Sequence, residues 1–155
     1  MRNISKIKSI NLTGCKSLEQ LHCRNNQLTY LDLTSCPALW MIGIGDNQLQ
    51  LSNLLAIERK YPNTIWKGLG TQNLPARIVR IGETLFSDQN LFYDIYTKYI
   101  VIKNNVLAPT SDYTISNGKI RFNNLGTYTI IMTNDAIRSA PDAQARVVVE
   151  IKVII

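Results

Sequence analysis

The sequence predicts a mainly β protein in two parts, a short solenoid closed by a helix and then a β-sandwich. The first observation is a 21-residue period near the N-terminus, since periods of 20–29 residues with regularly placed leucines are typical of coils that must stack to bury their apolar sides. The second is a change, after residue 75, to short alternating runs separated by turn residues. With 155 residues the chain has room for two small domains. We expect the solenoid at residues 1–67, a linker at 68–75 and the sandwich at 76–155.

The period is clearest in two aligned stretches. Residues 18–28 (LEQLHCRNNQL) return 21 positions later as residues 39–49 (LWMIGIGDNQL). The apolar cores Leu21–Cys23 and Ile42–Ile44 are predicted to be parallel strands, stacked so that equivalent residues form columns. Leu21 should therefore lie beside Ile42, with both side chains facing the core.

One asparagine follows each of these strands at the same position, Asn26 in one coil and Asn47 in the next. An amide in a tight bend can bond backbone groups of its own coil and of the adjacent one, which satisfies groups that burial would otherwise leave without partners. We interpret Asn26 and Asn47 as a structural asparagine ladder rather than as ligand-binding residues.

After Leu49 the spacing becomes helical. Apolar residues recur three or four positions apart at Leu51, Leu54, Ile57 and Tyr61. Ser52 is the predicted N-cap and Pro62 stops the helix. This short amphipathic helix is expected to cap the open end of the solenoid. A helix that binds a membrane surface or a partner is the alternative, but two to three turns are not stable alone.

The clearest element of the second part is a hairpin at Tyr113–Phe122. Asn117-Gly118 is a type I′ turn signal, and a two-residue loop fixes the register. The predicted cross-strand pairs are Ser116–Lys119, Ile115–Ile120 and Tyr113–Phe122. The other predicted strands are Ala76–Ile81, Leu91–Ile95, Tyr99–Lys103, Asn124–Met132 and Arg146–Ile155. Six or seven short strands with turns between them are typical of a β-sandwich.

Charge and hydropathy narrow the classes of partner. The net charge is +6, but each part carries a similar excess of basic residues and the longest cationic run is Arg59-Lys60. Since no aromatic residues interleave with a basic run, nucleic-acid binding is disfavoured. No apolar run approaches the ~20 residues of a membrane span, and no secretory signal is recognisable.

The three cysteines, Cys15, Cys23 and Cys36, occupy inward repeat positions, where they are expected to act as small apolar residues. A Cys15–Cys36 bridge between neighbouring coils is an open alternative. The spacing of the cysteines and His22 matches no zinc site.

No catalytic constellation is recognisable. His22 is the single histidine, and alternation along a strand points its side chain away from Cys23. A weak calcium site formed by Asn134, Asp135 and Asp142 is an alternative reading of one loop. No cofactor motif is present, and we expect a protein that is not an enzyme.

The exposed side of the repeat is the candidate binding surface. In the first coil the outward residues are Gln20, His22 and Arg24, and in the next the same region holds Trp40 and Met41. Aromatic and arginine side chains dominate binding hot spots, so these five residues are the predicted partner-binding site. Packing of Trp40 and Met41 against the neighbouring domain or an absent coil is the alternative.

Two resemblances follow from these motifs. Residues 28–39 (LTYLDLTSCPAL) resemble the bacterial 21-residue leucine-rich repeats, and the agreement covers roughly residues 7–51. Residues 124–130 are similar to the tyrosine-corner approach of immunoglobulin-like domains, with Tyr128 as the tyrosine and Ile130 where antibody domains place a cysteine. A leucine-rich-repeat solenoid followed by an Ig-like β-sandwich resembles the internalin-like surface proteins of bacteria. The resemblance implies repeats that bind a partner and an Ig-like domain that extends and rigidifies them.

The expected function is therefore a non-enzymatic, secreted or cell-surface module that recognises a protein or a glycan through its repeat face. A structural stalk or spacer without a ligand is the alternative. Because Met1 leads almost directly into the repeat without a polar cap, we expect a fragment or a natural truncation. The open first coil and the apolar final strand are candidate edges for association with another copy.

Overall fold

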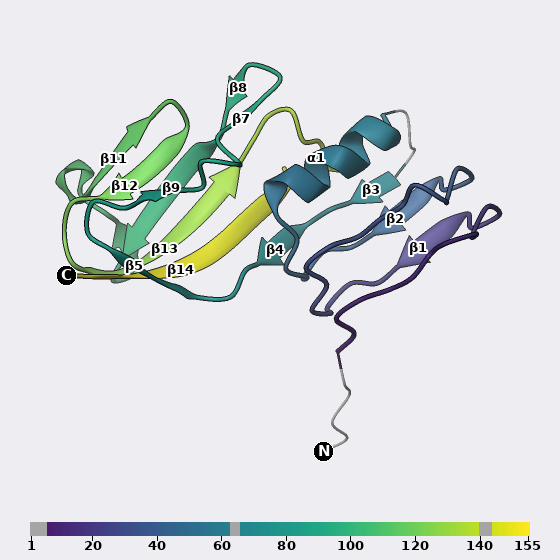
Figure 1. Cartoon of the computed structure of the whole chain (residues 1–155), viewed down its shortest axis with the longest axis horizontal. Coiled ribbons are helices and arrows are strands. Elements are labelled where there is room, and N and C mark those ends of the chain that lie inside the picture. The colour runs from purple at the N-terminus through teal and green to yellow at the C-terminus, as the bar shows by residue number, and fades with distance from the viewer. Residues whose placement is uncertain (1–5, 63–65, 140–143) are drawn as a thin grey trace.

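The computed structural model describes residues 6–62, 66–139 and 144–155 (Figure 1). These residues form a mainly β structure with one α-helix, α1 (Leu51–Lys60), and one 3-10 turn, η1 (Thr110–Asp112). The strands are β1 (Gln20–His22), β2 (Met41–Gly43), β3 (Trp66–Gly68), β4 (Thr71–Asn73), β5 (Arg77–Arg80), β6 (Thr84–Leu85), β7 (Leu91–Phe92), β8 (Ile95–Tyr96), β9 (Lys98–Lys103), β10 (Val106–Leu107), β11 (Tyr113–Ser116), β12 (Lys119–Phe122), β13 (Gly126–Thr133) and β14 (Arg146–Ile154).

Strands β1, β2 and β3 form a parallel sheet in that order, visible side by side in Figure 1. Leu21 pairs with Ile42 in register, and the two side chains are 7 % and 0 % exposed. The predicted stacking of the repeat is confirmed. The assigned strands begin one residue earlier than predicted, at Gln20 and Met41, and the ladder continues beyond them because Cys23 N–H donates to the Gly43 carbonyl.

The sequence prediction missed β3. Met41 pairs with Trp66, so the third turn of the chain is 25 residues long and holds α1 within it. The predicted linker at residues 68–75 is wrong, because Gly68 ends β3 and β4 lies within the same stretch. Along the chain the helix therefore comes between β2 and β3, and not after the last strand of the parallel sheet as predicted.

A ladder of three amide side chains stitches these turns together. The Asn26 Oδ1 accepts the Ile7 N–H at 3.0 Å, and its Nδ2 donates to the Cys23 carbonyl at 3.1 Å. Asn47 repeats this arrangement with Leu28 N–H and the carbonyls of Cys23 and Ile44. Both asparagines thus make the kind of backbone hydrogen bonds that the predicted ladder requires.

Gln72 supplies a third rung that was not predicted. Its Oε1 accepts the Leu49 N–H at 3.2 Å, and its Nε2 donates to the carbonyls of Ile44 and Leu69 at 2.9 and 2.7 Å. Gln72 lies in β4 and is 0 % exposed, so the ladder reaches from the repeat into the second part of the chain.

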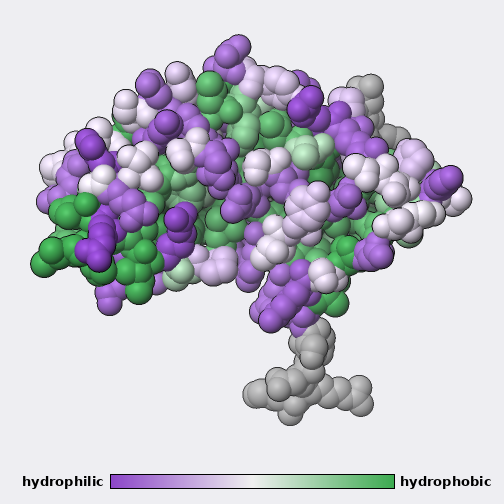
Figure 2. Space-filling model, in the orientation of Figure 1, coloured by the Kyte–Doolittle hydropathy of each residue, from purple (hydrophilic) through white to green (hydrophobic). Residues whose placement is uncertain are grey.

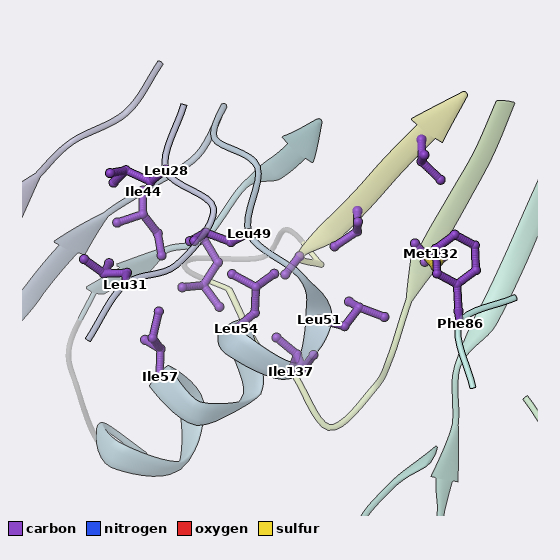
Figure 3. Packing of buried hydrophobic residues seen from close by; sticks show 14 of the residues in the cluster. Leu28, Leu31, Ile44, Leu49, Leu51, Leu54, Ile57, Phe86, Met132 and Ile137 are labelled. Carbon is purple, nitrogen blue, oxygen red and sulfur yellow. The ribbon is translucent and has the colours of Figure 1, made fainter. Parts of the chain in front are cut away.

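Helix α1 packs its apolar side into the core. Leu51, Leu54 and Ile57 are buried, and Figure 3 shows Leu54 and Ile57 facing Leu31 and Leu49. Ser52 is not the N-cap as predicted: Gln50 holds that position without a side-chain cap bond. Instead the Oε1 of Gln89, from the second part of the chain, accepts the Leu51 N–H at 2.9 Å, which satisfies a donor at the helix start.

A buried ion pair replaces one apolar residue of the parallel sheet. Lys67 pairs with Ile42 in register and is 6 % exposed. Its Nζ lies 2.6 Å from Glu58 Oε2 and donates to the Tyr61 carbonyl at 2.8 Å. The Lys67 stem thus continues the apolar column, while its ammonium is neutralised by a carboxylate from α1.

The second part contains a large sheet, a small sheet and a short hairpin. The large sheet runs β10-β9-β13-β14-β4, with β5 also pairing β14, and the small sheet runs β11-β12-β6. Apolar side chains of the large sheet meet the small sheet, where the rings of Phe122 and Tyr128 lie 4.4 Å apart. The predicted open edge at the final strand is wrong, because β14 pairs with β13 on one side and with β4 and β5 on the other.

The local strand predictions had mixed outcomes. All three predicted cross-strand pairs of the Tyr113–Phe122 hairpin are confirmed, and Asn117 and Gly118 both have positive φ, as a type I′ turn requires. The single strand predicted at Leu91–Ile95 is instead the β7–β8 hairpin, because Tyr93 and Asp94 take positive φ angles and reverse the chain.

Exposed apolar residues gather where the chain ends. Figure 2 shows hydrophobic side chains at the end of the molecule that carries the C-terminus in Figure 1. Ile154 and Ile155 are exposed there, together with Ile78 and Ile81, which lie in and just after the adjacent β5.

A polar cluster closes the approach to β13. Asp112 Oδ2 accepts bonds from Lys103 Nζ at 2.7 Å and from the Tyr128 hydroxyl at 2.9 Å, and its Oδ1 accepts the Asn124 amide at 2.7 Å. The bond from Lys103, with those from Asn124 and Tyr128, lowers the pKa of Asp112 from 3.8 to about 2. Asp112 therefore stays ionised and holds η1 against β13.

We predict that Asn47→Ala destabilises the fold by about 1–3 kcal/mol. The substitution leaves the buried Leu28 N–H and the Cys23 and Ile44 carbonyls without the hydrogen bonds that Asn47 makes to them. Asn26→Ala, at the half-buried end of the ladder, is the matched control and should cost less. Urea unfolding of both variants measures the difference. An equal decrease in the free energy of unfolding of the two variants would contradict a larger contribution from the buried Asn47.

We predict that the Asp112 cluster makes the fold sensitive to acid. Because the folded pKa lies below the unfolded one, the contribution of Asp112 is complete above about pH 4 and is lost as the pH falls through about 2. Asp112→Asn should flatten the dependence of unfolding free energy on pH in this range, as measured by urea unfolding between pH 2 and 5. Asp94→Asn, in the exposed β7–β8 turn, is the control and should keep the wild-type profile.

Candidate functional site

The candidate site is the exposed side of the parallel sheet, called here the repeat face. Its strand register aligns Gln20, Met41 and Trp66 in one row. The next row holds His22, Gly43 and Gly68. Because successive strand residues point to opposite sides, both rows project away from the buried column of Leu21 and Ile42.

Trp66, on the edge strand β3, has its ring over the backbone of Gly68 and next to that of Gly43. A Cβ added at Gly68 would lie 2.5–3.1 Å from three atoms of the Trp66 ring, and one added at Gly43 would lie 3.3 Å from one of these same atoms, Cζ3. A side chain at Gly68 would therefore push the ring off the sheet, whereas one at Gly43 would make only a tight contact with it. The ring is half-buried, which leaves part of its surface open to a partner.

The row beyond is also built on glycine. Gly45 and Gly70 approach so closely that a Cβ on Gly70 would lie 2.9 Å from the Gly45 Cα, and Gly70 has a φ of +59°. Both the contact and the backbone angle favour glycine at this position. The two turns of chain thus meet without side chains between them, and the face is smooth here.

Polar groups flank the ring. His22 Nε2 lies 3.4 Å from Gln20 Oε1, and His22 Nδ1 lies 3.3 Å from the position of a Gly43 Cβ. The Arg24 guanidinium lies beside Gly45 and 3.6 Å from Asp46 Oδ2. Since both partners of this ion pair are at least half exposed, it adds little stability and leaves Arg24 accessible to a ligand.

The structure brings four of the five predicted site residues onto this face. Gln20, His22 and Met41 are in the strand register, and Arg24 follows beside Gly45. Trp40 lies one residue before β2, outside the register, and is half-buried. A partner-binding role for these five residues stays a prediction.

Trp66 is the residue that sequence reasoning missed. Residues 66–70 (WKGLG) repeat the pattern of residues 41–45 (MIGIG), with glycines at the same two positions. Gly68 and Gly70 fall in the predicted linker at residues 68–75, whereas their spacing matches that of Gly43 and Gly45 in the previous turn. That match was the available sequence signal.

Behind the face the side chains are apolar apart from Lys67, which pairs with Glu58. Burial raises the pKa of the Cys23 thiol to about 11, so this sulfur is protonated and a poor nucleophile at neutral pH. His22 is exposed and Cys23 is buried, which confirms that the two point to opposite sides. Cys15, Cys23 and Cys36 are all free thiols in the structure.

The alternative calcium site is only partly described, since Asp142 lies outside the described residues. Asn134 Oδ1 accepts the Ala136 N–H at 2.9 Å, and Asp135 pairs with Lys98. Within the described ranges no group of three His, Cys, Asp or Glu side chains is placed to hold a metal ion.

The described residues contain no helix whose length and hydropathy would allow it to cross a membrane.

The fold and the repeat face define a mainly β protein with a repeated parallel sheet joined to an antiparallel one. No protein-family model and no curated protein sequence matches the chain. Among solved structures, the functional domain of InlJ from Listeria monocytogenes, described as including a cysteine ladder, matches with a TM-score of 0.53 and 14 % identity over 96 % of this chain and 36 % of that one. At this identity the likeness shows the fold alone.

Two internalin-like proteins of Listeria monocytogenes are also similar. The secreted protein Lmo2445 matches with a TM-score of 0.43 and 12 % identity, over 91 % of this chain and 53 % of that one. The protein lmo2027 matches with a TM-score of 0.38 and 15 % identity, over 90 % and 45 %. This chain thus spans about a third to a half of the length of these proteins.

We predict that Gly68→Ala displaces the Trp66 ring, at a cost of about 1–3 kcal/mol for overpacking. In a Trp40→Phe background Trp66 is the single tryptophan, and its fluorescence should move to longer wavelength as the ring becomes more exposed. Gly45→Ala is the control, because its Cβ would meet its nearest neighbours at 3.4–3.5 Å, a much looser contact. An unchanged spectrum for Gly68→Ala would contradict a ring seated on the glycine floor.

Proposed function

We propose that this chain is a non-enzymatic interaction module of a secreted or cell-surface bacterial protein, and that it recognises a protein or a glycan through the repeat face. In this proposal the first part is a short leucine-rich-repeat solenoid and the second an Ig-like β-sandwich. The fold likeness to the InlJ domain supports this arrangement. The bond of 3.2 Å from the Tyr128 hydroxyl to the Asn124 carbonyl supports the Ig-like assignment, because a tyrosine corner bonds backbone a few residues upstream.

The observation that carries the binding proposal is the Trp66 ring on its glycine floor. A flat aromatic surface gives a large contact area at a small cost in conformational entropy, and it suits either a sugar ring or an apolar side chain. Gln20, His22 and Arg24 lie on the same face and can donate hydrogen bonds at its margin. The residues proposed to bind are therefore the five predicted ones together with Trp66.

The size of the face limits the ligand. Three strands about 4.8 Å apart make a strip roughly 10 Å wide. The area of so narrow a strip is much smaller than the ~800 Å² that an ordinary protein partner covers. A sugar unit or a single protruding loop fits such a strip. A larger partner would need further turns of the same repeat.

A spacer is the second candidate, and one observation favours it. Strand β4 bonds both parts of the chain: Asn73 N–H donates to the Asn47 carbonyl, and Asn73 pairs with Val148 of β14. Shared backbone bonds of this kind resist hinge motion between the two parts. A stalk needs this rigidity even if it binds nothing.

Binding to arrays of immobilised glycans and of secreted-protein ectodomains separates the two candidates. We predict that wild-type protein gives reproducible hits and that Trp66→Ala weakens them at least about tenfold. Tyr30→Ala is the control, since Tyr30 is 66 % exposed and lies outside the repeat face, and it should retain the hits. Hits that survive combined replacement of Gln20, His22, Arg24, Trp40, Met41 and Trp66 would contradict recognition through this face, and the absence of hits would favour the spacer.

A further inference from the structure

We propose that the outer face of the large sheet binds the same face of a second copy, forming a weak two-fold symmetric dimer. This face is separate from the repeat face. Along β13 the buried Tyr128, Ile130 and Met132 point to the core, so the residues between them point outward. On the neighbouring strands the outward residues include aliphatic ones that are exposed: Ile100 of β9 is 48 % exposed and Leu107 of β10 is 73 % exposed.

The strand register arranges this face in rows that cross the strands. The central row is wholly apolar, with Ile131 of β13 between Ile100 of β9 and Val148 of β14. On one side, two residues further along β14, lies a second row that holds Ile102, Thr129 and Glu150. On the other side, two residues earlier along β14, lies Arg146, beside the row of Lys98 and Thr133.

The charges on β14 select one way of pairing. A copy turned by 180° about an axis along the central row keeps Ile131 over the partner's Ile131, but reverses the strand direction. The two outer rows then exchange places. Glu150, the single acidic residue among the outward residues of β14, comes to face the partner's Arg146, and the same contact forms again by symmetry.

The other in-plane axis is excluded by the same charges. An axis parallel to β13 that also keeps Ile131 over the partner's Ile131 would exchange β14 with β9, and would place Arg146 over the partner's Lys98 and Glu150 over the partner's Ile102. Like charges brought together at an interface oppose binding. The sequence along β14 is therefore self-complementary in the antiparallel arrangement alone.

The area of the face predicts a weak association. Four strands about 4.8 Å apart and five to six residues about 3.4 Å apart give roughly 20 Å by 20 Å. The resulting ~400 Å² per copy is about half of a standard interface. We therefore expect a dissociation constant on the order of 100 μM, so the dimer forms only at high concentration or where copies are held together on a surface.

Sedimentation velocity of the 155-residue chain between about 5 and 500 μM tests the proposal. The wild type should shift from monomer to dimer across this range. Ile100→Lys should remain monomeric, whereas Ile115→Lys, an isoleucine with a similar exposed fraction of 44 % on the small sheet, should dimerise like the wild type. A wild type that stays monomeric at 500 μM, or equal dimerisation by the two variants, overturns the proposal.

Charge exchange tests the axis and guards against variants that fail to fold. Arg146→Glu and Glu150→Arg should each raise the dissociation constant at least about tenfold, and the double variant should restore dimerisation. Circular dichroism confirms that each variant is folded before sedimentation. A folded double variant that remains monomeric overturns the antiparallel arrangement.

Discussion

The structure depends on one interaction, the hydrogen bonding of a buried amide side chain to two successive turns of the chain. Asn47 accepts one backbone N–H and donates to carbonyls of its own and the preceding turn, and Gln72 does the same one turn later. Without these bonds the bends beneath the repeat face would bury unpaired backbone groups, each at a cost of about 1–3 kcal/mol. The amides thus allow three short strands to stack tightly enough to form a core.

The last rung also explains why the two parts of the chain form a continuous structure. Gln72 lies in β4, which bridges to Asn47 on one side and pairs with β14 on the other. Gln89 adds a second link by accepting the first N–H of α1. Backbone bonds on both sides of β4 leave no linker between the parts, so the orientation of the repeat face is fixed relative to the large sheet.

What could be predicted from the sequence was whatever local chemistry or exact recurrence determines. The Asn117-Gly118 turn fixes the hairpin register by itself, and the 21-residue recurrence placed Leu21 beside Ile42. The third turn of the repeat was not predicted, because α1 lengthens its period to 25 residues and because Gln72 takes the place of the ladder asparagine. The pairing of β5 with β14 joins residues more than seventy positions apart, and no local signal specifies such a contact. Because β3 was not predicted, its residue Trp66 was missing from the predicted binding site.

The glycines of the repeat face connect stability to recognition. Gly43 and Gly68 occupy strand positions, where each glycine is destabilising by roughly 0.5–1 kcal/mol relative to alanine. Local backbone preference does not explain them, but the Trp66 ring does, since a Cβ at Gly68 would overlap it. The buried amides and the column of Leu21 and Ile42 supply stability that offsets this cost. A smooth face carrying one flat aromatic ring is thus possible only because the opposite side of the same three strands is so completely bonded and packed.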